Sequence, residues 1–252
     1  MITQLGDVLA DFSDVFPKSP TDFGSCLLLP FEITVTSNSS PVASRPYRIN
    51  LPTSKKVDAV LDKLLAAGLI QHSTSPWASP AVVIPKKAGD IRITVNYKKL
   101  NKLSILGQLP ISRVDEVLDR LGTGRIFSLF DPVSSFHQIT VHKDTIPLTA
   151  FCTPTRLFEW LVMPHGSSAA PGWLAKVINE VIKGLDRVAA YLDDVIIFDA
   201  DPSLHVANMK DFFLRLRKHN LNLSPSKATI CATDTDFLGH TISPTGIMPK
   251  AK

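Results

Sequence analysis

The sequence is poor in several patterns that would mark a specialised class of protein. Its three cysteines, Cys26, Cys152 and Cys231, are widely spaced and form no Cys-x-x-Cys pair, which argues against a disulfide framework and against a zinc site. No stretch approaches the roughly 18 consecutive apolar residues of a membrane span. The N-terminus lacks the basic, apolar and small-residue order of a signal peptide. We therefore expect a soluble, intracellular protein.

A strong excess of one charge is also missing. Lys and Arg number 27 and Asp and Glu number 23, so the formal net charge is +4 and the pI is about 8.9. This mild basic excess permits a polyanionic partner without requiring one. The 252 residues are 44% hydrophobic and 20% charged, which excludes a disordered or fibrous chain. The length suits one large or two small lobes with a hydrophobic core.

The first fifty residues contain five prolines, with Ser and Asn between them. Proline removes a backbone donor and interrupts helices, so this region predicts an extended arm over residues 1–50 with at most short strands, such as residues 32–36. Hydrophobic periodicity then predicts four helices. They begin near Thr53 with Thr53 or Ser54 as the cap, after a capping box of Ser112 and Asp115, at Pro171, and after Ser203.

Short β-prone runs alternate with these helices. Residues 81–84 and 91–95 predict a hairpin with a basic tip. Residues 126–130 predict a strand, and extended structure is expected to resume over residues 136–141. Residues 188–190 and 195–198 predict a second hairpin around Tyr191 to Asp194. The order is mixed α+β and not a strict βαβ alternation.

Three aspartates lie at the ends of these hydrophobic strands. Asp131 follows residues 126–130, and Asp193 and Asp194 occupy the tip of the second hairpin. Clustered carboxylates bind hard divalent cations, and two such ions about 3.5–4 Å apart stabilise an in-line displacement at phosphorus. Aspartate is also favoured in turns, so an Asp-Asp pair between two apolar runs is, taken alone, more often a solvated turn. The neighbouring sequence decides between the two readings.

Seven motifs in the same order resemble those of reverse transcriptases, beside the Tyr191-Leu192-Asp193-Asp194 hairpin. The resemblance runs from about Phe16 onward and is greatest to the gypsy-like LTR-retrotransposon group. The motifs are residues 45–48 (RPYR), 75–80 (SPWASP) with the basic hairpin that follows, 96–101 (NYKKLN), 136–139 (FHQI), 149–151 (TAF), 158–164 (FEWLVMP) and 237–240 (FLGH).

The resemblance implies an α+β right-hand polymerase fold with fingers and palm subdomains, without thumb or RNase H. The reverse transcriptase domain would span residues 51–252, after the extended arm of residues 1–50. The fingers would comprise about residues 51–125 and 140–160, and the palm about residues 110–140 and 160–245. The implied activity is RNA-directed DNA polymerisation, in which a primer is extended on a template with deoxynucleoside triphosphates.

By the same resemblance, individual residues receive roles. The catalytic and metal-binding residues would be Asp131, Asp193 and Asp194, holding two Mg²⁺ ions or Mn²⁺ in their place. The nucleotide-binding residues would be Lys86, Arg92, Phe136, His165 and Gly166, with Phe136 as the steric gate against a 2′-hydroxyl. The primer and template residues would be Tyr191, Phe237, Leu238, Gly239 and His240. Apart from this resemblance, Lys86 has the alternative of a solvated hairpin tip, and Phe136 is more often an ordinary half-buried strand aromatic.

The resemblance also implies partners and a location. The partners would be an RNA or DNA template with its primer, the deoxynucleotides, and the RNase H, integrase and protease domains of a Pol polyprotein. No membrane partner is expected. The location would be intracellular, either in a cytoplasmic particle of the element or in the nucleus.

Several residues near the expected chemistry depart from the family pattern. Pro132 stands where an aliphatic residue is usual, Ser135 replaces a usual glycine, and Ala175 replaces a usual glutamine. His165 stands where gypsy-like enzymes generally carry phenylalanine. The primer-grip match also lies close to Lys252, with no thumb after it. These departures leave a second hypothesis open, a decayed or domesticated remnant that keeps the fold, is catalytically silent and at most binds nucleic acid.

Overall fold

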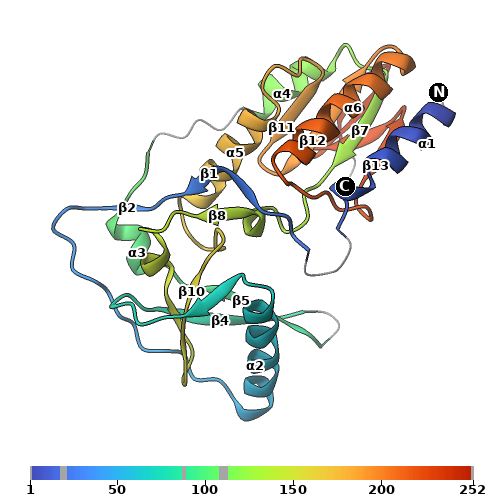
Figure 1. Cartoon of the computed structure of the whole chain (residues 1–252). Helices are drawn as coiled ribbons and strands as arrows, with labels where there is room; N and C mark the ends of the chain where they lie inside the picture. The colour runs from blue at the N-terminus through green and yellow to red at the C-terminus, as the bar shows by residue number, and fades with distance from the viewer. Residues whose placement is uncertain (1, 18–21, 87–88, 108–112, 251–252) are drawn as a thin grey trace. The chain divides into compact units, whose positions relative to one another are not determined.

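The computed structural model describes residues 2–17, 22–86, 89–107 and 113–250 (Figure 1). The chain forms two compact units, each assembled from separate stretches of sequence. We call residues 1–28, 109–138 and 172–252 the aspartate unit, and residues 29–108 and 139–171 the hairpin unit. In the described part of the chain, no helix combines the length and the apolar character needed to cross a bilayer.

A four-stranded antiparallel sheet forms the centre of the aspartate unit. Its order is β11-β12-β7-β13, and strand alternation gives it two faces, each covered by a helix. On one face, Val117 and Leu118 pack with Phe127 and Ile196. On the other, the Phe213 ring lies 5.4 Å from that of Phe130. The elements are α4 (Val114–Leu121), β7 (Ile126–Phe130), β11 (Val188–Tyr191), β12 (Asp194–Asp199), α6 (Pro202–Lys218) and β13 (Thr229–Ala232).

Helix α1 (Ile2–Asp11) begins the described part of the chain, so the expectation of an extended arm over residues 1–50 is wrong for its first part. Phe12, just after α1, is buried, and its ring lies 5.7 Å from that of Phe213 on α6. Arg217 on α6 donates to Asp14 Oδ2 at 2.8 Å. The prolines that suggested an arm begin only at Pro17, so nothing before it interrupts a helix. The remaining elements of this unit are α1 (Ile2–Asp11), most of α5 (Ala170–Val181), and the sheet β14 (Thr235–Phe237), β15 (His240–Ser243) and β16 (Gly246–Pro249).

The hairpin unit is built on a five-stranded mixed sheet in the order β3-β10-β9-β4-β5, in which only β4 and β9 are parallel. Helix α2 contacts β3 and β5 and buries Val57 and Leu61. Its N-cap is Asn50, which accepts from the Thr53 backbone N–H at 3.0 Å, and not the expected Thr53 or Ser54. The elements are α2 (Leu51–Ala66), β3 (Ile70–His72), β4 (Ser79–Pro85), β5 (Ile91–Val95), β9 (Phe151–Cys152) and β10 (Leu157–Trp160).

Short elements complete the chain. Two-stranded sheets pair β1 with β8 and β2 with β6. These elements are β1 (Cys26–Phe31), β2 (Thr34–Val35), α3 (Lys98–Leu103), β6 (Ser104–Ile105), β8 (Ile139–Val141) and the 3-10 turns Ser13–Val15, Ser135–Gln138 and Ile146–Thr149.

Two further local expectations need correction. Residues 135–138 form a 3-10 turn before β8, so extended structure resumes only at Ile139. Ser112 of the expected capping box lies outside the described residues, and the N-cap position of α4 is Arg113, which makes no side-chain cap bond. The first turn of α4 instead holds Asp115 and Glu116, whose negative charges suit a helix N-terminus.

Candidate active site

The sheet of the aspartate unit brings Asp131 beside Asp194. Phe130 pairs with Val195 between β7 and β12, so the next position along the antiparallel ladder sets Asp131 against Asp194. Tyr191 pairs with Asp194 in the β11–β12 hairpin, which leaves Leu192 and Asp193 as its two turn residues. The three predicted aspartates therefore gather at one end of one sheet.

The turn that presents Asp193 has an uncommon backbone. Leu192 has a φ of 55°, in the left-handed region that non-glycine residues rarely adopt. Ser134, three residues after Asp131, has a φ of 45°. Such conformations persist only where the surrounding structure enforces them, and they concentrate at functional sites.

The charges of these aspartates act on one another, and a lysine acts on all three. Partial desolvation, followed by the charges of Asp193 and Asp131, raises the pKa of Asp194. Lys227 Nζ lies 2.6 Å from Asp131 Oδ2, and this hydrogen bond, with the negative charges of all three aspartates, raises the pKa of Lys227. Lys227 was not among the predicted site residues, because a lysine in a loop after a proline carries no sequence pattern of its own.

Pro132 fits the strand end without a missing hydrogen bond. It forms an antiparallel bridge with Leu223. The bonds flanking this bridge run from Val133 N to Asn222 O at 3.0 Å and from Ser224 N to Asp131 O at 2.8 Å, so neither needs an N–H at residue 132. On the other side, β12 begins only at Asp194. Proline at position 132 therefore costs the sheet no backbone hydrogen-bond donor.

The segment after Pro132 is clamped by Gln138. Its side chain donates to the carbonyl oxygens of Val133 at 2.6 Å and Asn222 at 2.8 Å, and accepts from Asn222 N at 2.7 Å. Within this segment, the Ser135 hydroxyl donates to Asp193 Oδ2 at 3.5 Å. Half-buried Phe136 lies on the same 3-10 turn. The turn thus holds the predicted gate residue beside a residue that touches the aspartate pair.

A buried network of hydrogen bonds supports the sheet that carries the aspartates. Ser128 Oγ lies 2.8 Å from His205 Nε2, and His205 Nδ1 lies 2.8 Å from Asp199 Oδ2. Asn208 donates to the other Asp199 oxygen at 2.7 Å, and Ser128 Oγ accepts from Cys231 N at 2.9 Å. Ser128, Asp199 and His205 are each at most 2% exposed. These hydrogen bonds join β7, β12, β13 and α6. Because the network is buried, Ser128 cannot act as a nucleophile.

Four of the five predicted nucleotide-binding residues belong to the hairpin unit. Lys86 and Arg92 lie on the β4–β5 hairpin, where Ile84 pairs with Arg92. Lys86 Nζ is 4.0 Å from Asp90 Oδ2, and both side chains are more than half exposed. Part of the tip, residues 87–88, lies outside the described residues. The predicted hairpin is present and carries the positively charged side chains of Lys86 and Arg92.

His165 and Gly166 are fixed against β5 in the same unit. Gly166 has a φ of +101°, and a Cβ there would lie 2.5 Å from the Val95 carbonyl oxygen, so only glycine fits. Asn101 donates to Gly166 O at 3.0 Å and accepts from Ser168 N at 3.1 Å. Burial, and then the charge of Arg92, lowers the pKa of His165 to about 4. His165 is therefore neutral at physiological pH.

The predicted primer residues differ in their burial. Phe237 is 3% exposed and packs in the core with Phe127, so it is a packing residue. Leu238 and Gly239, with φ values of 50° and 76°, form the turn between Phe237 and its partner His240. Tyr191, at the end of β11, belongs to the same unit.

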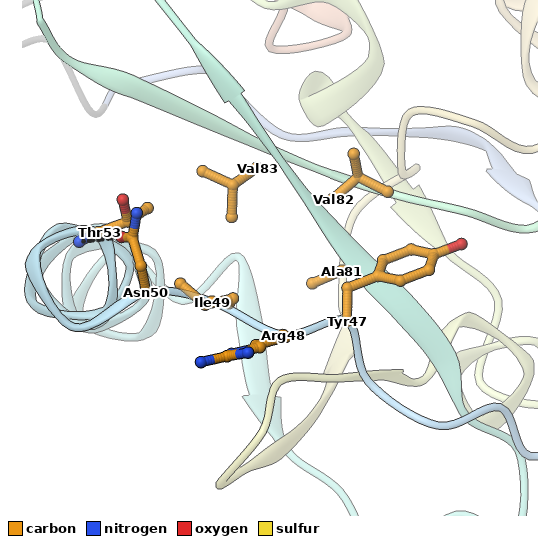
Figure 2. A pocket seen from close by; sticks show the side chains of 8 residues that line it. All are labelled: Tyr47, Arg48, Ile49, Asn50, Thr53, Ala81, Val82 and Val83. Carbon is orange, nitrogen blue, oxygen red and sulfur yellow. Dashed lines mark hydrogen bonds between the residues drawn. The ribbon is translucent and has the colours of Figure 1, made fainter.

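The hairpin unit also contains two neighbouring hollows that share Tyr47. The first, of about 320 Å³, is lined by Tyr47, Arg48, Ile49, Asn50, Thr53 and residues 81–83 (Figure 2). The second, of about 280 Å³, is lined by Ser44, Arg45, Tyr47, Pro80, Asn96, Lys98 and Lys99. The Tyr47 hydroxyl accepts from Asn96 Nδ2 at 2.8 Å. An aromatic ring among cations suits contact with a nucleic acid strand.

The chain matches one protein family. Residues 84–242 match the family model described as reverse transcriptase (RNA-dependent DNA polymerase). The chain is 34% identical over 221 residues to the retrovirus-related Pol polyprotein from transposon 297 of Drosophila melanogaster, covering 85% of this chain and 21% of that protein. It is 29% identical over 250 residues to the transposon Tf2-3 polyprotein of Schizosaccharomyces pombe, covering 98% and 19%. The chain thus spans about a fifth of these relatives.

Solved structures share the fold. The foamy viral protease-reverse transcriptase in complex with RNA/DNA hybrid superposes with a TM-score of 0.89 at 23% identity, over 99% of this chain and 34% of that one. The same viral protein in complex with dsDNA gives 0.89 at 24% identity, over 99% and 52%. The predicted mixed α and β polymerase fold is confirmed.

Proposed function

Because the chain belongs to the reverse transcriptase family, we propose that it is an RNA-directed DNA polymerase domain that extends a primer on a template with deoxynucleoside triphosphates. The observation that carries the proposal is the placement of Asp131, Asp193 and Asp194 at one end of one sheet. Three neighbouring carboxylates repel one another, and a bound divalent cation would offset that repulsion.

We propose that these carboxylates hold two Mg²⁺ ions, or Mn²⁺ in their place. Their oxygen donors suit hard cations. As they lie in the described residues, no three His, Cys, Asp or Glu side chains form a group that could hold a metal ion, and Asp131 is engaged by Lys227, so the side chains would have to move to bind one. Bound metal would stabilise the charge that develops on the attacking 3′ oxygen and the leaving pyrophosphate. The aspartates would fix the ions against the sheet.

The remaining predicted residues receive roles within the same proposal. Lys86 and Arg92 would bind the triphosphate, since Arg offers a fork of donors and Lys a compact charge. Phe136 would stack under the deoxyribose, and neutral His165 would offer a ring nitrogen to the sugar or base. Gly166 would let the backbone approach the nucleotide closely.

The nucleic acid partner would be a template with its primer. Structural neighbours with the same fold are complexes with dsDNA and with an RNA/DNA hybrid, which supports this class of partner. We propose that Tyr191 and residues 238–240 contact the primer, and that Tyr47, with the cations around it, contacts the template strand. Relatives are Pol polyproteins, so RNase H, integrase and protease domains are the proposed neighbours in the full protein.

Primer extension on an RNA template tests the proposal. The assay compares wild type, the double variant Asp193→Asn/Asp194→Asn and the control Asp234→Asn, which changes an exposed aspartate of the same unit. Mg²⁺ and Mn²⁺ are tested separately. Extension by wild type and Asp234→Asn that is lost in the double variant supports a working polymerase. Failure of all folded proteins with both metals would contradict it and favour the silent remnant.

A further inference from the structure

The position of Lys227 points to a role that the triad alone does not explain. Ser224 donates its backbone N–H to the Asp131 carbonyl at 2.8 Å, so the loop after α6 is fixed to the backbone of this aspartate. Three residues later, the Lys227 ammonium lies 2.6 Å from the carboxylate of the same residue. One short loop therefore holds Asp131 at both its main chain and its side chain.

The two partners differ in their freedom to move. The Asp131 side chain is 22% exposed, whereas that of Lys227 is 64% exposed. Asp131 is fixed at a strand end, but the lysine can turn into solvent without leaving a cavity. The pair can therefore open at the cost of one partly exposed ion pair, an interaction that contributes little to stability near a protein surface.

A divalent cation held by Asp131 would share its carboxylate with the lysine. Lys227 engages Asp131 Oδ2, and its charge also acts on Asp193 and Asp194. If both cations stayed, the ammonium group and the divalent ion would repel one another at a distance of a few ångströms.

We propose that Lys227 is the internal counter-ion of the aspartate triad, that it competes with divalent metal for Asp131, and that metal binding displaces it. The inference rests on the proposed function, since it takes the triad as the metal site. Lys227 is in this account a positioning residue, which offsets the repulsion among the carboxylates until metal replaces it.

Titration of Mn²⁺ affinity by electron paramagnetic resonance tests the competition directly, without any measurement of polymerase activity. Lys227→Met is compared with Lys250→Met, a matched control that removes an exposed lysine paired with Asp236 at 2.7 Å in the same unit. Both variants lower the net charge equally. We expect Lys227→Met to bind Mn²⁺ about 3- to 10-fold more tightly than Lys250→Met, and the difference to shrink in high salt. Lys227→Gln repeats the test should Lys227→Met fold poorly.

Acetylation of lysines read by mass spectrometry tests displacement in the wild-type chain. Saturating Mg²⁺ is expected to raise the labelling of Lys227 several-fold and to leave that of Lys250 unchanged. Equal Mn²⁺ affinity in the two variants, weaker binding in Lys227→Met, or unchanged labelling of Lys227 would overturn the inference. Loss of Mn²⁺ binding in Asp193→Asn/Asp194→Asn shows that the triad itself is the metal site. If wild type binds no Mn²⁺ at all, the proposed metal site fails with it.

Discussion

Asp131 and Asp194 lie side by side because Phe130 and Val195, the residues that adjoin them in the sequence, are paired partners in β7 and β12. The register of an antiparallel sheet fixes this relationship, since a slip of one residue would turn every buried side chain of β12 to the wrong face. The hydrophobic core of the unit therefore also sets the spacing of the candidate catalytic carboxylates.

Removing the charge of Asp194 should stabilise the fold at neutral pH in the absence of divalent cations. Desolvation and the neighbouring aspartates raise the pKa of Asp194, so the folded state holds its proton more tightly than the unfolded state does. The stability gained from that proton is complete below the unfolded pKa and is lost as the pH rises through the folded pKa. Asp194→Asn should raise the Tm at pH 7, with the difference fading towards pH 3.

Thermal unfolding of wild type, Asp194→Asn and Asp234→Asn across this pH range checks the prediction. Asp234→Asn controls for the loss of one negative charge, since it removes a carboxylate at an exposed position of the same unit. A lower Tm for Asp194→Asn at pH 7 would show that the carboxylate is stabilising and would refute the repulsion described above.

Gly166→Ala should destabilise the hairpin unit by about 2–4 kcal/mol. The new Cβ would meet the Val95 carbonyl oxygen at 2.5 Å, and the backbone φ of +101° is already unfavourable for alanine. Gly68→Ala is the matched control in the same unit, because Gly68 has a φ of +68° but nothing within 4 Å, so it should cost only about 1 kcal/mol. Urea unfolding measures both, and equal losses would mean that the contact with Val95 is unimportant.

His205→Ala should cost about 2–4 kcal/mol, because the buried Asp199 carboxylate and the Ser128 hydroxyl each lose the hydrogen bond to the imidazole and keep only Asn208 and the Cys231 N–H, respectively. The loss should not add to that of Asp199→Ala, since the two residues belong to one network. A double-mutant cycle by urea unfolding measures the coupling. Simple additivity of the two losses would show that the network does not act as a unit.

His165 should make stability depend on pH between about 4 and 6.5. Its folded pKa is lowered to about 4 by burial and by Arg92, below the ordinary value of 6.5. The unfolded state therefore binds the proton first as the pH falls, and the fold loses stability over this window. His165→Phe should remove that part of the pH dependence in urea titrations. An unchanged pH profile for the variant would show that His165 is protonated as easily in the folded state as in the unfolded one.

The sequence predicted the parts of the site that short hydrophobic runs define. The β4–β5 hairpin and the strands that carry the aspartates follow from apolar runs interrupted by turn residues, and these were predicted correctly. Helix α1 was not predicted, because the five prolines that follow it in the first fifty residues favour an extended chain. The turn that holds Phe136 was read as strand, since an aromatic before Ile139 fits a β pattern equally well.

Other features could not be predicted because they depend on tertiary contacts. Nothing in the spacing of Ser128, Asp199 and His205 marks them as one chain of hydrogen bonds, because only the packing of α6 on the sheet brings them together. Likewise Lys227 is 96 residues from Asp131 in the sequence and meets it only through the loop after α6.

A metal-specificity switch at Asp131 tests the central claim most directly, that these aspartates hold the ions that drive nucleotide transfer. Asp131→Cys places a soft thiolate where Mg²⁺ needs a hard oxygen, whereas Mn²⁺ accepts sulfur more readily. With Mg²⁺, single-nucleotide incorporation by Asp131→Cys should be at least about 100-fold lower than that of wild type. Replacing Mg²⁺ with Mn²⁺ should raise incorporation by Asp131→Cys at least about 10-fold, and should raise that of Asp131→Ala less under the same conditions. Undiminished incorporation by Asp131→Cys with Mg²⁺, or equal recovery of Asp131→Ala with Mn²⁺, would contradict a metal-binding role for Asp131.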